Sequence, residues 1–561
     1  MNRTLVIGLD GASYHLVERW KDDLPNLGRL MENGTSGILR SVLPPRSIPA
    51  WYCFATGMNP AKLGVFGFSQ RRPGTYDYTF ANSTYCQMPM FWEWAGQYGV
   101  KSGIILVPGT YPPRPTNGFL VSGWPAPINR GKLIYTDPAD LSGEIDTVLG
   151  APLEFASSQA LDPQHDAEMA SELSRLVQMH TTAAEHLLQT RDWQLGVVVL
   201  APLDRASHQF WRHMDPGHPQ HDELLVDRYG DALRASYVEH DASVGRLLAT
   251  VDDDDSVFVV SDHGFGPARR SFYINEWLRQ QGYLVLRDGT PVGQASWRTK
   301  LVGQLAAPLF KLNSSSETFR RLTEPFKRRL LANALRDRFV RAKHGGRVRL
   351  NHLPVDWQHT RAYSPDESSL CLNLRGRDPQ GVVEPGEEAR ILLHEIIEGL
   401  TSITDPQTGG SLSVRSYLKE DIYAGPHLVS APELTLVVDD FNTMVMAELG
   451  SGTLFDEDIN WSGTHNQDGL FVASGPSIVD GIRIDLDLVD IAPTILHLAG
   501  LPIPAESDGE VRSEVFRHDS SAFLQPVNGA PVTSFTQPNK LLSAEAQAEV
   551  EQQLRRLGYL E

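Results

Sequence analysis

The sequence predicts an α/β protein whose mostly parallel sheet lies between helical layers, with an inserted basic helical cap. Short β-branched runs recur along the chain, each ending in a polar residue or a glycine; they cover residues 4–9, 102–107, 195–200, 256–260, 434–438 and 470–473. Amphipathic helical patterns, such as 166–189 and 231–251, lie between them. Strands that alternate with helices of this length are typical of βαβ units.

The cap is predicted from charge and from the loss of the strand pattern. The chain of 561 residues has a net charge of −19, yet residues 297–350 hold fourteen Lys or Arg against three acids. This stretch is helical in pattern and has no strand signal. We therefore expect a core formed by 1–295 together with 346–530, a helical insertion at 296–345, and a C-terminal tail and helix at 531–561.

Composition excludes several classes of protein. Hydrophobic residues make up 41% of the chain and charged residues 21%, values typical of folded globular proteins. No apolar run is long enough to span a membrane, and the N-terminal apolar run is too short for a secretion signal. Cys53, Cys86 and Cys371 follow no metal-binding or disulfide spacing, so we expect a cytoplasmic protein. The acidic charge disfavours a nucleic-acid coat protein.

Four short motifs place carboxylates and imidazoles at or near predicted strand ends: Asp10, Asp204 with His208, the pair Asp262 and His263, and His465. Singly, each has an ordinary explanation, a helix N-cap for the aspartates or a hydrogen-bonded surface histidine. Together they converge where parallel sheets bind ligands, and like charges there repel unless a cation neutralises them. The mixed donors favour Zn²⁺, with Mn²⁺ as the alternative, and six ligands suit two divalent ions. Such a pair clamps the attacking and leaving oxygens of a displacement at phosphorus.

An ordered set of motifs resembles the alkaline phosphatase superfamily. Asp10 is followed by Ser-Ile-Pro at 47–49, T-G-x-x-P at 56–60, D-x-x-x-H at 204–208, D-H-G at 262–264 and G-T-H at 463–465. The set is most similar to the type I phosphodiesterase/nucleotide pyrophosphatase branch and, within it, to the predicted phosphohydrolase/phosphomutase group. The resemblance extends over nearly the whole chain and implies an alkaline-phosphatase-like catalytic core.

The resemblance also implies roles for particular residues. Ser47 would be the nucleophile, forming a phosphoseryl intermediate, and would bind one metal with Asp10, Asp262 and His263. The other metal would be held by Asp204, His208 and His465. A metal-bound serine oxygen suits this role because the free hydroxyl is a weak nucleophile at neutral pH.

The chain departs from the branch at two positions. Serine replaces the usual threonine nucleophile, and Phe68 stands where an asparagine helps to bind a phosphate oxygen. Arg46 and Lys62 are the nearby cations that could bind substrate instead. Formylglycine-dependent sulfatase chemistry is disfavoured because Cys53 lacks the required sequence context.

The expected activity is metal-dependent hydrolysis of a small anionic phosphate ester, with a phosphodiester or nucleotide pyrophosphate bond favoured and a nucleotide or nucleotide sugar as candidate substrate. Two alternatives stay open: a phosphomonoesterase or phosphomutase using the same serine, and a non-catalytic binding protein that keeps the fold. For the insertion at 296–345 we favour attraction of anionic substrates over a solvated surface or peripheral membrane contact. The oligomeric state is not predicted.

Overall fold

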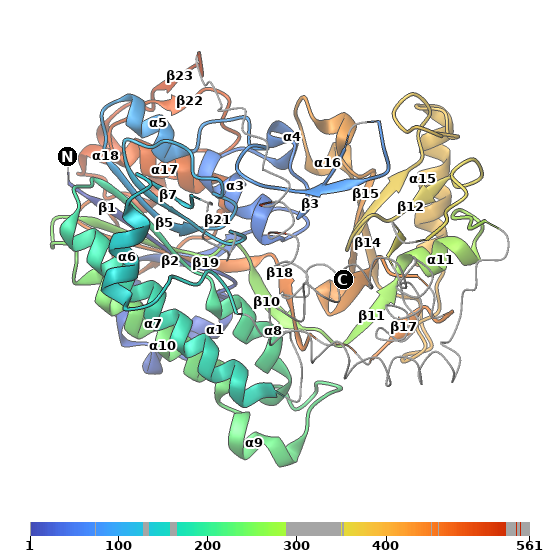
Figure 1. Cartoon of the computed structure of the whole chain (residues 1–561), viewed down its shortest axis with the longest axis horizontal. Helices are drawn as coiled ribbons and strands as arrows, with labels where there is room; N and C mark the ends of the chain where they lie inside the picture. Colours follow the sequence, from blue (N-terminus) through green and yellow to red (C-terminus); the bar gives the residue numbers. More distant parts are fainter. Residues whose placement is uncertain are drawn as a thin grey trace, which may run out of the picture.

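The computed structural model describes residues 2–72, 74–126, 134–157, 165–287, 349–350, 353–449, 452–457, 459, 461–533, 546 and 550. In this part of the chain, ten strands form the main sheet (Figure 1). Their order across the sheet is β20 (Ile482–Arg483), β2 (Gly34–Arg40), β19 (Asp468–Ser474), β9 (Ser256–Val260), β1 (Thr4–Leu9), β8 (Leu195–Leu200), β5 (Ser102–Val107), β6 (Gly118–Ser122) and β7 (Thr136–Asp137), with β21 (Leu486–Asp487) also paired to β2.

The centre of this sheet is parallel, as the sequence predicts. Strands β9, β1, β8, β5 and β6 all run the same way, whereas β19 and β7 run against their neighbours. Every residue of β1, β8 and β5 is buried. Strands covered on both faces need continuous apolar sequences, which explains the β-branched runs.

Helices cover both faces of the main sheet (Figure 1). One layer contains α1 (Tyr14–Arg19), α2 (Pro25–Glu32), α6 (Leu141–Leu149), α7 (Asp166–Thr190), α8 (Pro202–Met214) and α10 (Ala232–Leu248). The other contains α3 (Ser47–Thr56), α5 (Phe91–Gln97) and α17 (Ile491–Leu498). The predicted helices at 166–189 and 231–251 are therefore confirmed as α7 and α10.

A second sheet forms a separate lobe, on the right of Figure 1. Its strand order is β12 (Ala362–Tyr363), β13 (Ser369–Leu372), β15 (Leu434–Val438), β16 (Thr443–Met446), β11 (Arg270–Tyr273) and β17 (Phe455–Asp456), with β14 (Val414–Leu418) also paired to β15. Helices α11 (Ile274–Gln280) and α15 (Glu387–Thr401) contribute Trp277, Leu392 and Ile396 to a hydrophobic core of this lobe.

One predicted strand has the right position in the sequence but belongs to a different sheet from the one expected. Residues 434–438 form a buried strand, β15, yet it lies in the second sheet and pairs antiparallel with β13, β14 and β16. A buried β-branched run has the same sequence signature in either sheet, so the pattern alone cannot assign it.

Two predicted segments lie outside the described residues. These are the whole insertion at 296–345 and most of the tail at 531–561. Shorter elements complete the described fold: α4 (Pro60–Leu63), β3 (Ser69–Arg71), β4 (Tyr78–Phe80), α9 (Glu223–Tyr229), β10 (Gly264–Pro267), α16 (Lys419–Ile422), β18 (Gly463–Asn466), β22 (Ile503–Pro504), α18 (Ser521–Leu524) and β23 (Gly529–Ala530). Among the helices described, none has the length and apolar character needed to cross a bilayer.

Candidate active site

Three neighbouring strands deliver carboxylates to one edge of the main sheet. Strand β1 lies between β9 and β8, and its register pairs Gly8 with Val260 and Leu9 with Leu200. The carboxyl ends of the three strands therefore meet. Asp10 follows β1 directly, Asp262 follows β9 after one residue, and Asp204 lies in the first turn of α8, just after β8. This edge is where open parallel sheets bind ligands.

Asp10, Asp262 and His263 form the first cluster of candidate metal ligands, with ligand atoms within 4.8 Å of one another. Nε2 of His263 lies 3.7 Å from Oδ1 of Asp10 and 3.2 Å from Oδ2 of Asp262. The opposite oxygens are held in place: Trp51 Nε1 donates to Asp10 Oδ2 at 3.1 Å, and the Gly11 amide donates to Asp262 Oδ1 at 3.2 Å. Each carboxylate thus presents one oxygen to the cluster.

Those two presented oxygens fit a cation. Asp10 Oδ1 and Asp262 Oδ2 are buried, and no hydrogen-bond donor among the described residues reaches either one. Buried carboxylate oxygens in folded proteins are normally hydrogen-bonded, because desolvation without a partner is costly. A divalent ion would satisfy both atoms at once.

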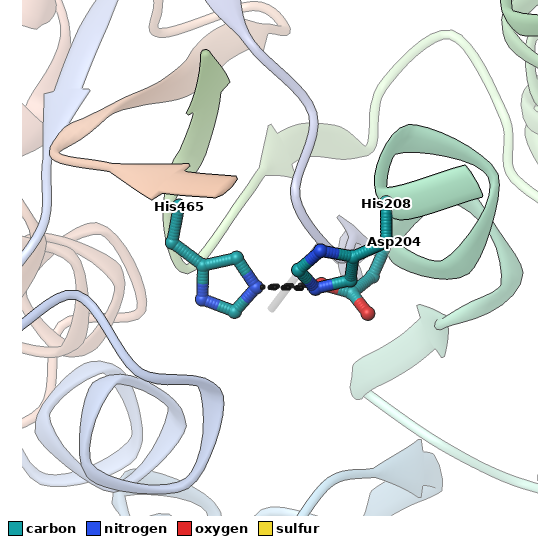
Figure 2. Close-up of side chains that lie close together, drawn as sticks. All are labelled: Asp204, His208 and His465. Atoms are coloured by element: carbon teal, nitrogen blue, oxygen red, sulfur yellow. Dashed lines mark hydrogen bonds and ion pairs between the residues drawn. The ribbon is translucent and has the colours of Figure 1, made fainter. Parts of the chain in front are cut away.

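Asp204, His208 and His465 form the second cluster (Figure 2). Asp204 and His208 lie four residues apart on α8 and therefore share one face of the helix. Nε2 of His465 is 3.0 Å from Asp204 Oδ1 and 3.0 Å from Nε2 of His208. His465 lies within β18, which pairs with β10 so that His465 faces Phe265. The short β10–β18 ribbon carries His465 to the strand ends.

Backbone carbonyls orient the three imidazoles. Nδ1 of His208 donates to the carbonyl of Gly463 at 2.8 Å, and Nδ1 of His465 donates to that of Pro45 at 2.9 Å. Nδ1 of His263 donates to the carbonyl of Gly264 at 3.3 Å. This tautomer leaves the Nε2 lone pair directed into the cluster, the arrangement usual for metal-binding histidines. If both rings are neutral, the Nε2 atoms of His208 and His465 face each other as acceptors, so this contact needs either a proton on His465 or a metal ion bound by both.

The pKa shifts of residues in the two clusters also favour a bound cation. Burial, followed by repulsion from Asp262 and Asp204, raises the pKa of Asp10 well above its ordinary value. Burial also raises the pKa of Asp262 to about 7. Burial lowers the pKa of His208 to about 3 and holds that of His263 well below its ordinary value. Without a cation, protons are therefore favoured on Asp10 and Asp262 and these two imidazoles stay neutral. Asp204 differs, because the neighbouring imidazoles hold its pKa below the ordinary value in spite of burial, while Asp204 in turn raises the pKa of His465.

Ser47 stands beside the first cluster. It is the first residue of α3, is buried, and has its Oγ 3.2 Å from Nε2 of His263. The start of a helix favours negative charge, so an alkoxide or a phosphate oxygen is stabilised there. The structure thus brings together Ser47 and all six predicted ligand residues, while their catalytic and metal-binding roles stay predictions.

The two candidate substrate-binding cations occupy different places. Arg46 directly precedes Ser47, is only 6% exposed, and donates from Nη1 to Asp366 Oδ2 of the second lobe at 2.7 Å. Lys62 instead pairs with Asp508 at 2.6 Å and donates to the backbone carbonyl of Glu506. Phe68 packs edge-on against Trp124, with ring centroids 5.7 Å apart.

Two pockets open onto this centre. The first, which we call the apolar pocket, has a volume of about 400 Å³ and is bordered by Asp10, Ser47 and Asp204. The second, the interlobe pocket, has a volume of about 560 Å³ and is bordered by Arg46, Phe68, His465, Glu367 and residues of β15 and β16. Lys62 lines neither pocket.

Sequence reasoning missed several residues that shape the site. Trp51 orients Asp10, while Asp366 and Glu367 come from the second lobe. Trp51 is two residues beyond the Ser-Ile-Pro motif, in an apolar helix where a tryptophan is expected to be an ordinary core residue. Asp366 and Glu367 lie in a loop without periodicity, and no sequence signal connects them to Arg46, which lies more than 300 positions away.

Comparison with known proteins identifies the family. The family model described as type I phosphodiesterase / nucleotide pyrophosphatase matches residues 4–468. Among solved structures, murine ectonucleotide pyrophosphatase / phosphodiesterase 5 has 13% sequence identity and a TM-score of 0.50, with 92% of this chain and 100% of that chain covered. The human protein of the same name has 13% sequence identity and a TM-score of 0.47, and the match covers 92% of this chain and 100% of that chain. No curated protein sequence matches. The chain belongs to the type I phosphodiesterase / nucleotide pyrophosphatase family of phosphoric ester hydrolases.

Proposed function

We propose that this chain is a two-metal phosphodiesterase that works through a phosphoseryl intermediate on Ser47. The observation that carries the proposal is the position of Ser47, whose hydroxyl is 3.2 Å from His263 and which borders the same pocket as Asp10 and Asp204. Ser47, Asp10, Asp262 and His263 would hold one ion. The other would be held by Asp204, His208 and His465.

The donor set supports Zn²⁺ as the resident ion, with Mn²⁺ as the alternative, because it mixes imidazole nitrogen with carboxylate oxygen. Divalent ions here would neutralise the converging carboxylates, lower the pKa of the serine hydroxyl and stabilise charge on the leaving oxygen. The remaining steps depend on the residues of the chain itself.

Ser47 reacts as the alkoxide, its proton having passed to solvent. Its Oγ forms a bond to phosphorus while the bond to the leaving oxygen breaks on the opposite side. This gives a phosphoserine that still carries the other substituent, and the leaving oxygen takes a proton from solvent and departs as a free alcohol or phosphate. Water then attacks the same phosphorus, regenerates Ser47 and releases a phosphoric monoester. The N-terminal end of α3 stabilises negative charge at Ser47 throughout.

Arg46 is proposed to bind a phosphate oxygen in place of the asparagine that Phe68 replaces. Its Nη1 donates to Asp366, while its buried Nη2 has no hydrogen-bond partner among the described residues. Arg46 borders the interlobe pocket together with His465. A guanidinium held in this way loses little freedom when it binds an anion. Because Lys62 is paired elsewhere, it is not part of this proposal.

The two pockets support a diester over a monoester. A monoester carries a single substituent on phosphorus, whereas a diester carries two, and two separate pockets border the residues of this one centre. A nucleotide or nucleotide sugar remains the candidate substrate for the interlobe pocket. Cytoplasmic location is kept as a proposal on the sequence argument alone.

The test compares p-nitrophenyl methyl phosphate with p-nitrophenyl phosphate, using enzyme loaded in turn with zinc and manganese, in isotopically labelled water. We expect a higher kcat/KM for the diester and one solvent oxygen in the released methyl phosphate. A preference for the monoester would contradict the diester assignment. Transfer of the phosphoryl group to an added alcohol, without label, would indicate a phosphotransferase or phosphomutase.

A further inference from the structure

The interlobe pocket carries a carboxylate without a close partner of its own. Arg46 pairs with Asp366 at 2.7 Å, and Arg349 pairs with Glu448 at 3.1 Å. Glu367, the remaining acid of this group, is partly buried and borders the pocket. Both arginines act on its charge, but among the described residues no hydrogen bond or ion pair reaches its carboxylate.

A carboxylate in this position is a strong hydrogen-bond acceptor that lacks a donor. Burial raises the pKa of Glu367, and the charges of Arg46 and Arg349 oppose that rise. Desolvated carboxylate oxygens are normally matched by donors, because leaving them unmatched is costly. Hydroxyl groups of a ligand would supply these donors. An ammonium group fits less well, since the two guanidinium groups that act on Glu367 would repel it.

Aromatic side chains line the same pocket. Phe68, Phe441 and Trp461 all border it, together with aliphatic residues of β15 and β16. The Trp461 ring packs against the imidazole of His208, with centroids 4.2 Å apart, so this wall begins beside the second cluster. A sugar ring has C–H groups on its faces and hydroxyls at its edge, and it therefore matches aromatic walls and a carboxylate acceptor at once. The volume of about 560 Å³ is usual for a small ligand.

The backbone fixes two residues of this wall in strained conformations. Ser368, which follows Glu367, has φ 59°, and Phe441 has φ 69°. Bulky side chains rarely adopt such left-handed values. The amide of Ser368 donates to the carbonyl of Val445, and its carbonyl accepts from the amide of Leu436, which holds the strained residue in place. Strain of this kind clusters at ligand-binding sites, where side chains are positioned before the ligand arrives.

We propose that the interlobe pocket binds a sugar as one arm of the phosphodiester and that Glu367 is the specificity-determining residue, accepting hydrogen bonds from the sugar hydroxyls. This inference rests on the proposed function, because it takes the sugar to be part of the substrate. It holds whichever arm leaves phosphorus.

The test uses metal-loaded enzyme and the methyl diester of glucose 6-phosphate, together with analogues in which each ring hydroxyl in turn is replaced by hydrogen. Products are separated by chromatography, so either arm can be the leaving group. Loss of a hydroxyl that Glu367 binds should lower kcat/KM about 10- to 100-fold, because the carboxylate is left unmatched. The other deoxy analogues should stay closer to the parent ester.

The variants show whether Glu367 causes the discrimination. Glu367→Met removes the acceptor at similar size and should bring the sensitive analogue within about twofold of the parent, as a double-mutant cycle requires. Glu367→Gln, which keeps an acceptor oxygen, should discriminate partially. Glu398→Met is the matched control, because Glu398 is exposed on α15 and borders neither pocket, and it should keep the wild-type ratio.

A binding measurement separates this inference from the proposed function. Calorimetry on metal-loaded Ser47→Ala, which needs no turnover, should show glucose 6-phosphate binding more tightly than at least one deoxy analogue. Equal kcat/KM for all analogues in an active wild type overturns the sugar inference and leaves the phosphodiesterase proposal intact, as does an aminodeoxy ester that exceeds every hydroxylated one. No turnover of any ester, with binding that still depends on a hydroxyl and on Glu367, overturns the phosphodiesterase proposal alone. No turnover with equal binding overturns both.

Discussion

The neighbours of Ser47, rather than the reactivity of a free serine hydroxyl, suit it to nucleophilic attack. Its hydroxyl contacts His263 at the start of α3. Replacement by alanine should reduce turnover of an aryl phosphodiester by about 10³-fold or more, because the hydroxyl that lies beside the first cluster is lost. Metal content, measured by elemental analysis, should stay near wild type, since six ligand side chains remain.

The control for that variant is Ser142→Ala on α6, where the partly buried serine donates a local hydrogen bond to the carbonyl of Ala139. It should behave as wild type in both assays. Wild-type turnover in Ser47→Ala would remove the covalent mechanism from consideration, and a trapped phosphoprotein in the wild type that is absent from the variant would support it.

His465 is the residue that links the β10–β18 ribbon to the second cluster. Its Nε2 lies within 3.0 Å of both Asp204 and His208, so His465→Ala removes one of three donors from that cluster. We expect the variant to bind one ion where the wild type binds two and to lose activity. His359→Ala is a suitable control, because His359 is 69% exposed and pairs only locally with Asp356. Two ions in His465→Ala would show that the ligand assignment is wrong.

The convergence of these residues could be predicted from sequence because each motif is local to a strand end or a short loop. Strand order then places Asp10, Asp204 and Asp262 at one edge. The partner of Arg46 could not be predicted in this way. Asp366 meets Arg46 only because two lobes pack together, and no periodicity in either segment records a contact across 320 positions.

At the scale of elements, local pattern identified strands and helices but not the sheet to which each strand belongs. Residues 434–438 have the same buried β-branched character as 195–200, and both are strands. The sheet to which a strand belongs is decided by long-range pairing and by the loops that connect the strands. Here β15 pairs antiparallel with β14 and β16 in the second sheet. The second lobe was therefore not separated from the main sheet by sequence reasoning.

The packing of α7 against α10 predicts a pH dependence. His180 and His240 are buried on these helices, and burial lowers the pKa of each to about 4. The unfolded chain, with ordinary histidine pKa values near 6.5, then binds more protons than the folded chain, so stability is full above about pH 6.5 and falls as the pH drops towards 4. Each histidine should contribute a loss of about 2–3 kcal/mol over this range.

The measurement is urea unfolding of wild type and His240→Gln from pH 7 to pH 4. The variant should lose less stability on acidification than the wild type, by about the contribution of one histidine. His359→Gln, at an exposed position, should follow the wild-type curve. Parallel curves for wild type and His240→Gln would contradict the assignment of this acid sensitivity to the helix pair.

At the scale of the whole molecule, the Arg46–Asp366 pair connects the catalytic centre to the second lobe. Gly67 permits this contact, because a Cβ there would lie 2.8 Å from Arg46 Nη1 and 2.9 Å from Asp366 Oδ2. Asp366→Asn should lower kcat/KM for a diester by about 10- to 100-fold, since the guanidinium loses its charged anchor, while metal content is kept. Asp508→Asn breaks the pair with Lys62 and is the matched control, expected to be near wild type. Equal losses in the two variants would indicate a general effect on folding.

Cation binding should stabilise the whole main sheet, because three aspartates converge from three of its strand ends. Each ion at a free concentration of 100 times its Kd should add about 2.7 kcal/mol to the free energy of unfolding, so a chelator should lower Tm by several degrees. Affinity should also rise with pH towards neutrality, because burial raises the pKa of Asp262 to about 7 and that of Asp10 well above its ordinary value, and a cation must displace these protons. Titration calorimetry in buffers of different ionisation enthalpy measures the protons released. The combined variant Asp262→Asn/His465→Ala should melt at the same temperature with and without chelator. A wild type that binds no divalent ion, or whose Tm ignores the chelator, would mean that these clusters are held together without metal.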